Sequence, residues 1–197
     1  ADQDESYLEN LKAVLMQNLA QLTDVEQRVI EERFAINPLD GALLRQRAHA
    51  YAEERGLPFV TISYAQSLDG SIAAARGQPL ALSGPISLTM THALRAAHDA
   101  ILVGIGTVLG DDPRLTVRLV AGPDPQPVVV DSVLRLPPTA KLLQHPRGVW
   151  LATTDAERPT AMHPLPASVR VLEVGAGADG RVDLPAMLAE LGRRGIR

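Results

Sequence analysis

Hydrophobic residues in the first quarter of the chain recur at the spacing of amphipathic helices. Leucines between positions 8 and 22 are three or four residues apart, which places them on one apolar face. A second apolar series follows at residues 25–30, and a third helix is predicted over residues 40–55, with Gly56 as its C-terminal cap. We therefore predict that residues 1–57 form a small helical N-terminal segment.

The pattern changes after Pro58, where stretches rich in β-branched residues alternate with helical patterns. Strands are predicted at residues 59–65, 99–105, 127–134, 148–153 and 169–174. Helices are predicted at residues 87–98, after a cap at Ser83 or Gly84, and at residues 184–195. Strands that alternate with helices favour an α/β domain with a mostly parallel sheet, here residues 58–197.

Composition narrows the possible functions. The chain is 46% hydrophobic and 21% charged, as soluble globular proteins are. It has no cysteine, which excludes disulfides and thiolate metal sites and fits a reducing compartment, and its five histidines lack metal-ligand spacing. The longest apolar run is about eleven residues, short of the roughly 18 that span a membrane. Residues 1–56 carry a net charge of −5 and the remainder +1, which disfavours nucleic-acid binding.

The stretch "AILVGIGTVLGDDPRLTVR", residues 100–118, holds the densest cluster of candidate site residues. Gly104, Gly106 and Gly110 follow a predicted strand, but Leu109 stands where a dinucleotide fingerprint would have its third glycine. Ligands of open α/β sheets bind beyond the carboxyl ends of strands, and glycine lets backbone amides approach a phosphate. The spacing leaves two interpretations open, a tight turn or a phosphate-binding turn.

Basic residues also lie on both sides of this strand. If residues 115–118 are extended, Thr116 and Arg118 share a face, and Arg118 could present its guanidinium to a phosphate. His92 and Arg95 lie one turn apart on a predicted helix. The alternative is a turn with solvated charges. Asp69 in "SLDG" could likewise be a site carboxylate or a turn residue.

The motifs "PFVTISYAQSLDGSIA", "LSGP", "LRAAHDAILVGIGTVLGDDPRLTVR" and "PVVVDSVLRLPPTAKLL" occur in this order. Together they resemble the pyrimidine reductase family of riboflavin biosynthesis, the reductase domain of the bifunctional deaminase/reductase. The resemblance covers residues 58–197. It implies a dihydrofolate reductase-like fold, a mostly parallel sheet flanked by helices. It also implies a cytoplasmic homodimer that uses NADPH to reduce a ribosylamino-pyrimidinone 5′-phosphate to its ribitylamino form.

The resemblance also implies a set of site residues. The cofactor side comprises Ala65, Ala81, Gly104, Gly106, Thr107, Asp111 and Ser132. The substrate side comprises Ser63, Arg95, Leu115 and Arg118, with the two arginines as phosphate contacts. Asp69 is expected to line the pocket near the reacting sugar, as the catalytic position.

Two departures from the family pattern leave alternatives open. Ser63 stands where bacterial members often have lysine, so the aminated and the deaminated pyrimidine are both candidate substrates. The family usually continues after "LGRRGIR" with a strand and a Glu-Gly-Gly turn, so the domain is expected to be truncated at Arg197. The alternative functions are another NADPH-dependent small-molecule reductase of the same fold and a non-catalytic binding or assembly protein. The absence of cysteine excludes the zinc deaminase activity.

Overall fold

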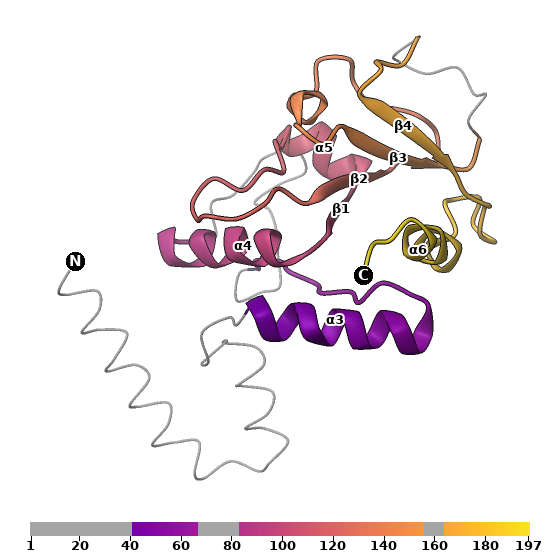
Figure 1. Ribbon diagram of the computed structural model, residues 1–197. Helices are drawn as coiled ribbons and strands as arrows, with labels where there is room; N and C mark the ends of the chain where they lie inside the picture. The colour runs from indigo at the N-terminus through magenta and orange to yellow at the C-terminus, as the bar shows by residue number, and fades with distance from the viewer. Residues whose placement is uncertain (1–40, 67–82, 156–163) are drawn as a thin grey trace, which may run out of the picture. The chain divides into compact units, whose positions relative to one another are not determined.

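The computed structural model describes residues 41–66, 83–155 and 164–197 (Figure 1). The two helices predicted before residue 40 lie outside the described residues. Helix α3, Gly41–Arg55, confirms the third predicted helix. Gly56 follows it with a φ of 66°, and its N–H donates to the carbonyl of Ala52 at 2.9 Å. Such a left-handed residue suits glycine, which has no Cβ to clash with the backbone.

Within the described residues, four parallel strands form the sheet, and its parallel arrangement is the one that the alternating pattern predicted. They are β1, Ala100–Gly104; β2, Gln126–Val130; β3, Val149–Thr153; and β4, Val169–Glu173. Their spatial order, β1-β2-β3-β4, is also their order along the chain. Parallel neighbours require crossover connections, and right-handed crossovers between successive strands pass over the same face of a sheet. The opposite face is left for another element to cover.

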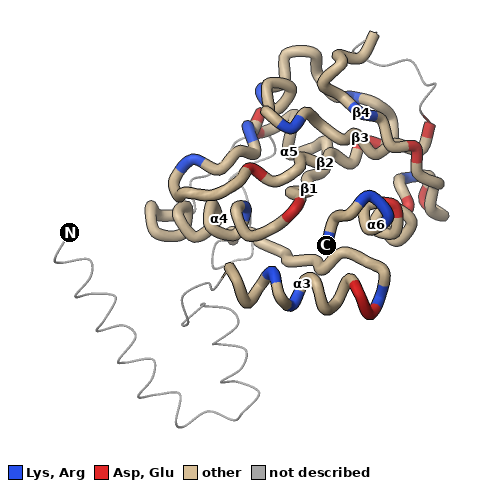
Figure 2. Tube along the Cα trace, viewed as in Figure 1, with Lys and Arg blue, Asp and Glu red and all other residues tan. Residues whose placement is uncertain are grey.

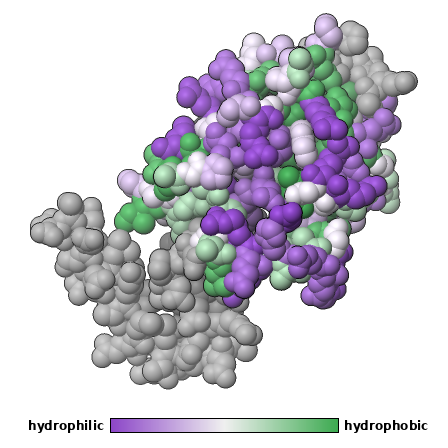
Figure 3. Space-filling view, viewed as in Figure 1, coloured by the Kyte–Doolittle hydropathy of each residue, from purple (hydrophilic) through white to green (hydrophobic). Residues whose placement is uncertain are grey.

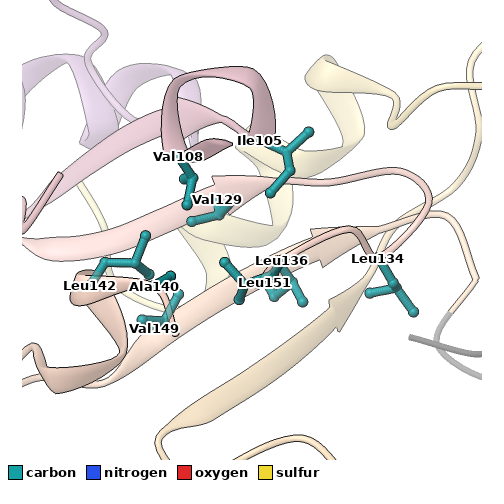
Figure 4. Packing of buried hydrophobic residues seen from close by; sticks show 9 residues of the cluster. All are labelled: Ile105, Val108, Val129, Leu134, Leu136, Ala140, Leu142, Val149 and Leu151. Carbon is teal, nitrogen blue, oxygen red and sulfur yellow. The ribbon is translucent and has the colours of Figure 1, made fainter. Parts of the chain in front are cut away.

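Alternate side chains of the strands enter two separate cores. On one face, Val129 and Leu151 pack with helix α5, Ile105–Asp111, and with the loop that contains the short helix η1, Lys141–Gln144 (Figure 4). On the other face, Val128 packs against helix α6, Leu184–Arg193. Because successive residues of a strand point to opposite faces, the run of valines in β2 serves both cores.

The helix predicted at residues 184–195 is α6, and its N-terminus is capped by Asp183, whose Oδ1 accepts from the amide of Ala186 at 3.0 Å. Gly192 lets this helix approach the chain after α3. A Cβ at position 192 would lie 2.8 Å from the carbonyl oxygen of Gly56 and 3.4 Å from Pro58. The boundary between the N-terminal segment, residues 1–57, and the domain of residues 58–197 stays a prediction. Gly56 and Pro58, on either side of it, both lie against α6.

One prediction near β1 is wrong. Residues 59–65 are not a strand; they are exposed apart from the half-buried Phe59, and Thr61 Oγ1 lies 2.8 Å from His98 Nε2. Strand β1 is not fully buried, since Leu102 is 43% exposed. The reason is pairing: within the described ranges, β1 pairs only with β2 and forms an edge of the sheet. A β-rich sequence alone does not form a strand without a neighbour to bond.

Polar side chains cover much of the face of the described residues that is seen in Figure 3, with smaller hydrophobic patches between them. Within residues 41–66, 83–155 and 164–197, no helix has both the length and the apolar character of a membrane span.

Candidate functional site

Helix α4, Pro85–Ala97, carries two of the residues that form the site. Its N-cap is Gly84 and it begins at Pro85, a favourable first residue because proline has no amide to leave unpaired. This confirms the helix predicted at residues 87–98. His92 and Arg95, one turn apart, both reach the segment that follows α5. The imidazole of His92 is buried, with 4% of the residue exposed.

The segment that follows α5 has an irregular backbone. Asp112 ends α5 in the left-handed region, with a φ of 43°, and Leu115 lies there too, with a φ of 59°. Left-handed conformations are uncommon for residues other than glycine and cost free energy. Leu115 is 3% exposed, so its burial in the core helps to hold this conformation. Its predicted contact with substrate is untested, and its side chain points into the protein.

Three consecutive residues of this segment are held by side chains from elsewhere. The Thr116 carbonyl accepts from Arg95 Nη1 at 3.2 Å, and the Val117 amide donates to Asp124 Oδ1 at 2.6 Å. The Arg118 amide donates to His92 Nδ1 at 3.0 Å. Because these residues are outside the sheet, side chains supply partners that a strand would have supplied.

Arg95 and Arg118 converge on one oxygen atom. Arg118 Nη1 lies 3.3 Å from the Thr116 carbonyl oxygen, the same atom that Arg95 contacts, and 3.0 Å from Thr116 Oγ1. The ion pairs found in the described parts of the chain involve other groups, so no described carboxylate neutralises either guanidinium. Two cations held together in this way form a site suited to an anion such as phosphate.

The electrostatics of the cluster agree with this interpretation. Burial lowers the pKa of Arg95, and the positive charge of Arg118 lowers it further. Arg95 Nε is buried and has no hydrogen-bond partner among the described atoms. Burial also lowers the pKa of His92, and so do the two arginines. The ring is therefore neutral at physiological pH, and since Nδ1 accepts from the Arg118 amide, the proton lies on Nε2.

The predicted cofactor residues of α5 lie at the carboxyl end of β1. Gly104 ends β1 and is the N-cap of α5, whose Ile105 and Val108 are buried. Gly106, Thr107 and Asp111 lie on the exposed side of the helix. The prediction of a glycine turn is corrected here, because the residues form a seven-residue helix. A Cβ at Gly104 or Gly106 would meet no atom within 4 Å, so the backbone there is open to a ligand.

Ser132 follows the neighbouring strand β2 and lies, like Gly104, at the carboxyl ends of the strands. Its hydroxyl oxygen accepts from the amide of Val182 at 3.0 Å, and its carbonyl accepts from Thr154 Oγ1 at 3.0 Å. Because the carboxyl ends of parallel strands lie together, the sheet brings Ser132 near the point where β1 leads into α5.

The structure brings together only part of the predicted set. Asp69 and Ala81 lie outside the described residues. Ser63 and Ala65 are exposed, in the segment before residue 67 that forms no strand. A shallow hollow between α3 and α6 is lined by none of the predicted residues. Within the described ranges, no group of three potential ligands could hold a metal ion.

Sequence reasoning missed two residues near the site. Asp124, which holds the Val117 amide, stands in "GPDP", a pattern typical of an ordinary turn. Asp112 pairs with Lys141, whose Nζ lies 3.1 Å from Asp112 Oδ2 and whose amide donates to Asp112 Oδ1 at 2.8 Å. These bonds from Lys141 lower the pKa of Asp112. Neither role could have been found from sequence spacing, because the partners come from other elements.

Figure 2 shows the basic residues along the loop between α5 and β2.

Known proteins are similar to this chain in sequence and in fold. The RibD C-terminal domain family matches residues 58–197. The chain is 39% identical over 150 residues to a 2,5-diamino-6-ribosylamino-4(3H)-pyrimidinone 5′-phosphate reductase of Archaeoglobus fulgidus, covering 71% of the chain and 67% of that relative. It is 43% identical over 122 residues to the riboflavin biosynthesis protein RibD of Mycobacterium tuberculosis, covering 60% and 34%. The chain thus spans from about a third to about two thirds of these curated relatives.

Solved structures agree. A deaminase/reductase of Thermotoga maritima superimposes with a TM-score of 0.64 at 28% identity, over 76% of this chain and 40% of that one. The riboflavin biosynthesis reductase of Saccharomyces cerevisiae gives a TM-score of 0.61 at 29% identity, over 80% and 69%. The parallel α/β sheet, the α5 segment and the paired arginines thus occur in a chain that belongs to the RibD C-terminal domain family, with its dihydrofolate reductase-like fold.

Proposed function

We propose that the protein is a reductase of riboflavin biosynthesis that acts on a ribosylamino-pyrimidinone 5′-phosphate with NADPH. The observation that carries the proposal is the convergence of Arg95 and Arg118 on the Thr116 carbonyl without a described carboxylate partner. Such a pair can bind a phosphate bidentately. The archaeal relative is named as a reductase of a phosphorylated pyrimidinone, which supports the same substrate class.

The exposed face of α5 fits a nicotinamide cofactor beside this anion site. Gly104 and Gly106 leave the backbone accessible, and Thr107 adds a hydroxyl on the same helix. The helix runs directly into the segment that carries Arg118, so one stretch of chain would contact both ligands. A cofactor held there would supply a hydride for the imine carbon of the ring-opened sugar, and with a proton from water or substrate at the imine nitrogen this would give the ribitylamino product.

The residues of this chain would then act mainly by positioning. Arg95 and Arg118 hold the 5′-phosphate and fix one end of an extended sugar, so that its reactive carbon stays near the cofactor. The neutral, buried His92 and the partly buried Arg95 form the inner side of the site. Asp69, at the predicted pocket near the sugar, completes the proposed set, and the functional unit is proposed to be a cytoplasmic homodimer.

Steady-state kinetics test the proposal. Oxidation of NADPH is followed with the aminated pyrimidinone phosphate, which the archaeal relative's name favours, and with its deaminated counterpart. Turnover of either compound supports the proposal, and Arg95→Ala and Arg118→Ala should each raise KM for the phosphorylated substrate at least tenfold, by the loss of a charged hydrogen bond of about 1.5–3 kcal/mol. Absence of turnover with both compounds would refute it, and unchanged KM values in both variants would refute the assignment of the phosphate contacts.

A further inference from the structure

Two side chains, those of His92 and Asp124, bond the backbone amides of Arg118 and of the residue before it. The guanidinium of Arg118 is exposed, but its backbone amide is bonded to the buried imidazole of His92. The preceding amide, of Val117, is bonded to Asp124. Among the described strands, none pairs with this segment to fix its backbone. Leu115 adopts a left-handed conformation, which costs free energy and needs support from its surroundings.

Helix α4 holds both sides of the arginine pair. Arg95 contributes a guanidinium, and His92, three residues earlier on the same helix, bonds the backbone of the other arginine. One helix therefore holds the Arg95 side chain and the backbone of Arg118 close to each other. Among the described hydrogen bonds, these two are the ones that join α4 to residues 116–118.

Asp124 also bonds the segment, and it belongs to a different part of the chain from α4. It lies just before β2, and its Oδ1 accepts the short 2.6 Å bond from Val117. Its backbone carbonyl accepts from Arg147 Nη1 at 3.4 Å, which connects it to the loop before β3. The carboxylate of Asp124 accepts a hydrogen bond from a backbone amide. It forms no described ion pair with Arg95 or Arg118.

We propose that His92 and Asp124 are positioning residues of the phosphate site, which hold the backbone of residues 117 and 118 so that Arg118 converges with Arg95. The inference rests on the proposed function, because it assumes that the arginine pair binds the substrate phosphate. His92 acts through the Arg118 amide and does not contact the phosphate. A side chain that accepts a hydrogen bond from the same place should therefore replace it, and an apolar ring of similar shape should not.

The test compares His92→Phe, which fills the space without an acceptor, with His92→Asn, whose Oδ1 can take the place of Nδ1. Asp124→Ala and Asp124→Asn form the same comparison on the other side. The control is Met187→Ala, which removes a fully buried side chain from α6 and lowers stability away from the site. Measurements are the melting temperature, KM and kcat, and the Kd for ribose 5-phosphate and for NADPH.

His92→Phe and Asp124→Ala should each raise KM and the Kd for ribose 5-phosphate about tenfold, the order expected for a misplaced charged contact, with little change in kcat or in NADPH affinity. The two Asn variants should recover most of the loss. Met187→Ala should lower the melting temperature without changing KM. A loss of phosphate affinity that the Asn variants restore, and that Met187→Ala does not show, would distinguish positioning from general destabilisation. One acceptor atom should not restore a general loss of stability.

The outcomes separate the inference from the proposed function. If the wild type binds ribose 5-phosphate but does not reduce the pyrimidinone, the proposed function fails and the inference is decided by the binding data. If the wild type reduces the pyrimidinone and the folded His92→Phe and Asp124→Ala proteins keep its KM and Kd, the inference alone is overturned. If the wild type shows neither binding nor turnover, both are overturned.

Discussion

Replacing Arg118 by glutamine should weaken phosphate binding while leaving the unliganded protein as stable as before or slightly more stable. Arg95 Nη1 and Arg118 Nη1 lie 3.2 Å and 3.3 Å from the same oxygen, so the two nitrogens are at most about 6.5 Å apart. In the absence of a ligand, the two positive charges repel each other, and no described carboxylate offsets the repulsion.

The size of the repulsion follows from this separation. Coulomb's law at about 6.5 Å gives roughly 0.6 kcal/mol in water and about 2.6 kcal/mol at an effective dielectric constant of about 20. Arg118 is exposed, so solvent screening favours the lower end, about 0.5–1 kcal/mol. Glutamine removes the charge and can still donate to Thr116. The expected rise in melting temperature is therefore small, at most about 1–4 °C.

The effect on phosphate should be larger and of opposite sign. Loss of one charged hydrogen bond of about 1.5–3 kcal/mol corresponds to a Kd raised roughly 10- to 150-fold. Thermal unfolding with and without ribose 5-phosphate measures both effects in one assay, because a ligand that binds only the folded state raises the melting temperature. Arg114→Gln, an equal change of charge four residues earlier in the same loop, is the matched control.

The reasoning would be refuted if Arg118→Gln lowered the melting temperature by several degrees and kept the wild-type Kd. That result would assign Arg118 a structural role. Equal losses of phosphate affinity in Arg114→Gln and Arg118→Gln would also refute it, since net charge and not the geometry at Thr116 would then account for binding.

Three further substitutions test the structure around the sheet. Asp131 is fully buried, and burial raises its pKa, so its contribution to stability is largest at low pH and is lost as pH rises through the raised pKa. Asp131→Asn should therefore gain melting temperature relative to wild type as pH rises above the ordinary carboxyl pKa, and a difference that stays constant with pH would contradict this. Gly148→Ala should lower the free energy of unfolding in urea by about 1–3 kcal/mol, because φ is 65° and a Cβ would lie 2.6 Å from the Ser168 carbonyl; an unchanged midpoint would show that the turn relaxes. Ser132→Ala removes the acceptor of the Val182 amide and should cost about 1–2 kcal/mol of stability and weaken NADPH binding; wild-type NADPH affinity would exclude Ser132 from the cofactor site.

Local patterns in the sequence predicted most of the regular structure. The helix at α4 follows from the cap predicted at its start and its helical pattern, and α6 follows from its helical pattern. The strands β2, β3 and β4 are short β-rich runs, and such runs, alternating with helices, predict the strands of a parallel sheet. These signals act over a few residues, so they can be read without knowing the fold.

Helix α5 shows where local reasoning failed. "IGTVLGD" contains two glycines, which disfavour a helix, and the sequence predicted a turn. The helix forms because Ile105 and Val108 enter the core beneath it, so tertiary packing offsets the weak propensity. Residues 59–65 show the converse, since a good β-pattern is not a strand where no neighbour pairs with it.

The sequence by itself identified Arg95 and Arg118 as candidate phosphate ligands, through their place in an ordered set of motifs. Only the tertiary structure showed that the two side chains meet at Thr116 and that His92 and Asp124 hold the backbone between them. The physical reason is the range of the interactions. Periodicity and caps depend on neighbours within one helical turn, whereas the bonds from α4 join residues 21 and 26 positions apart, whose meeting depends on how the whole sheet packs.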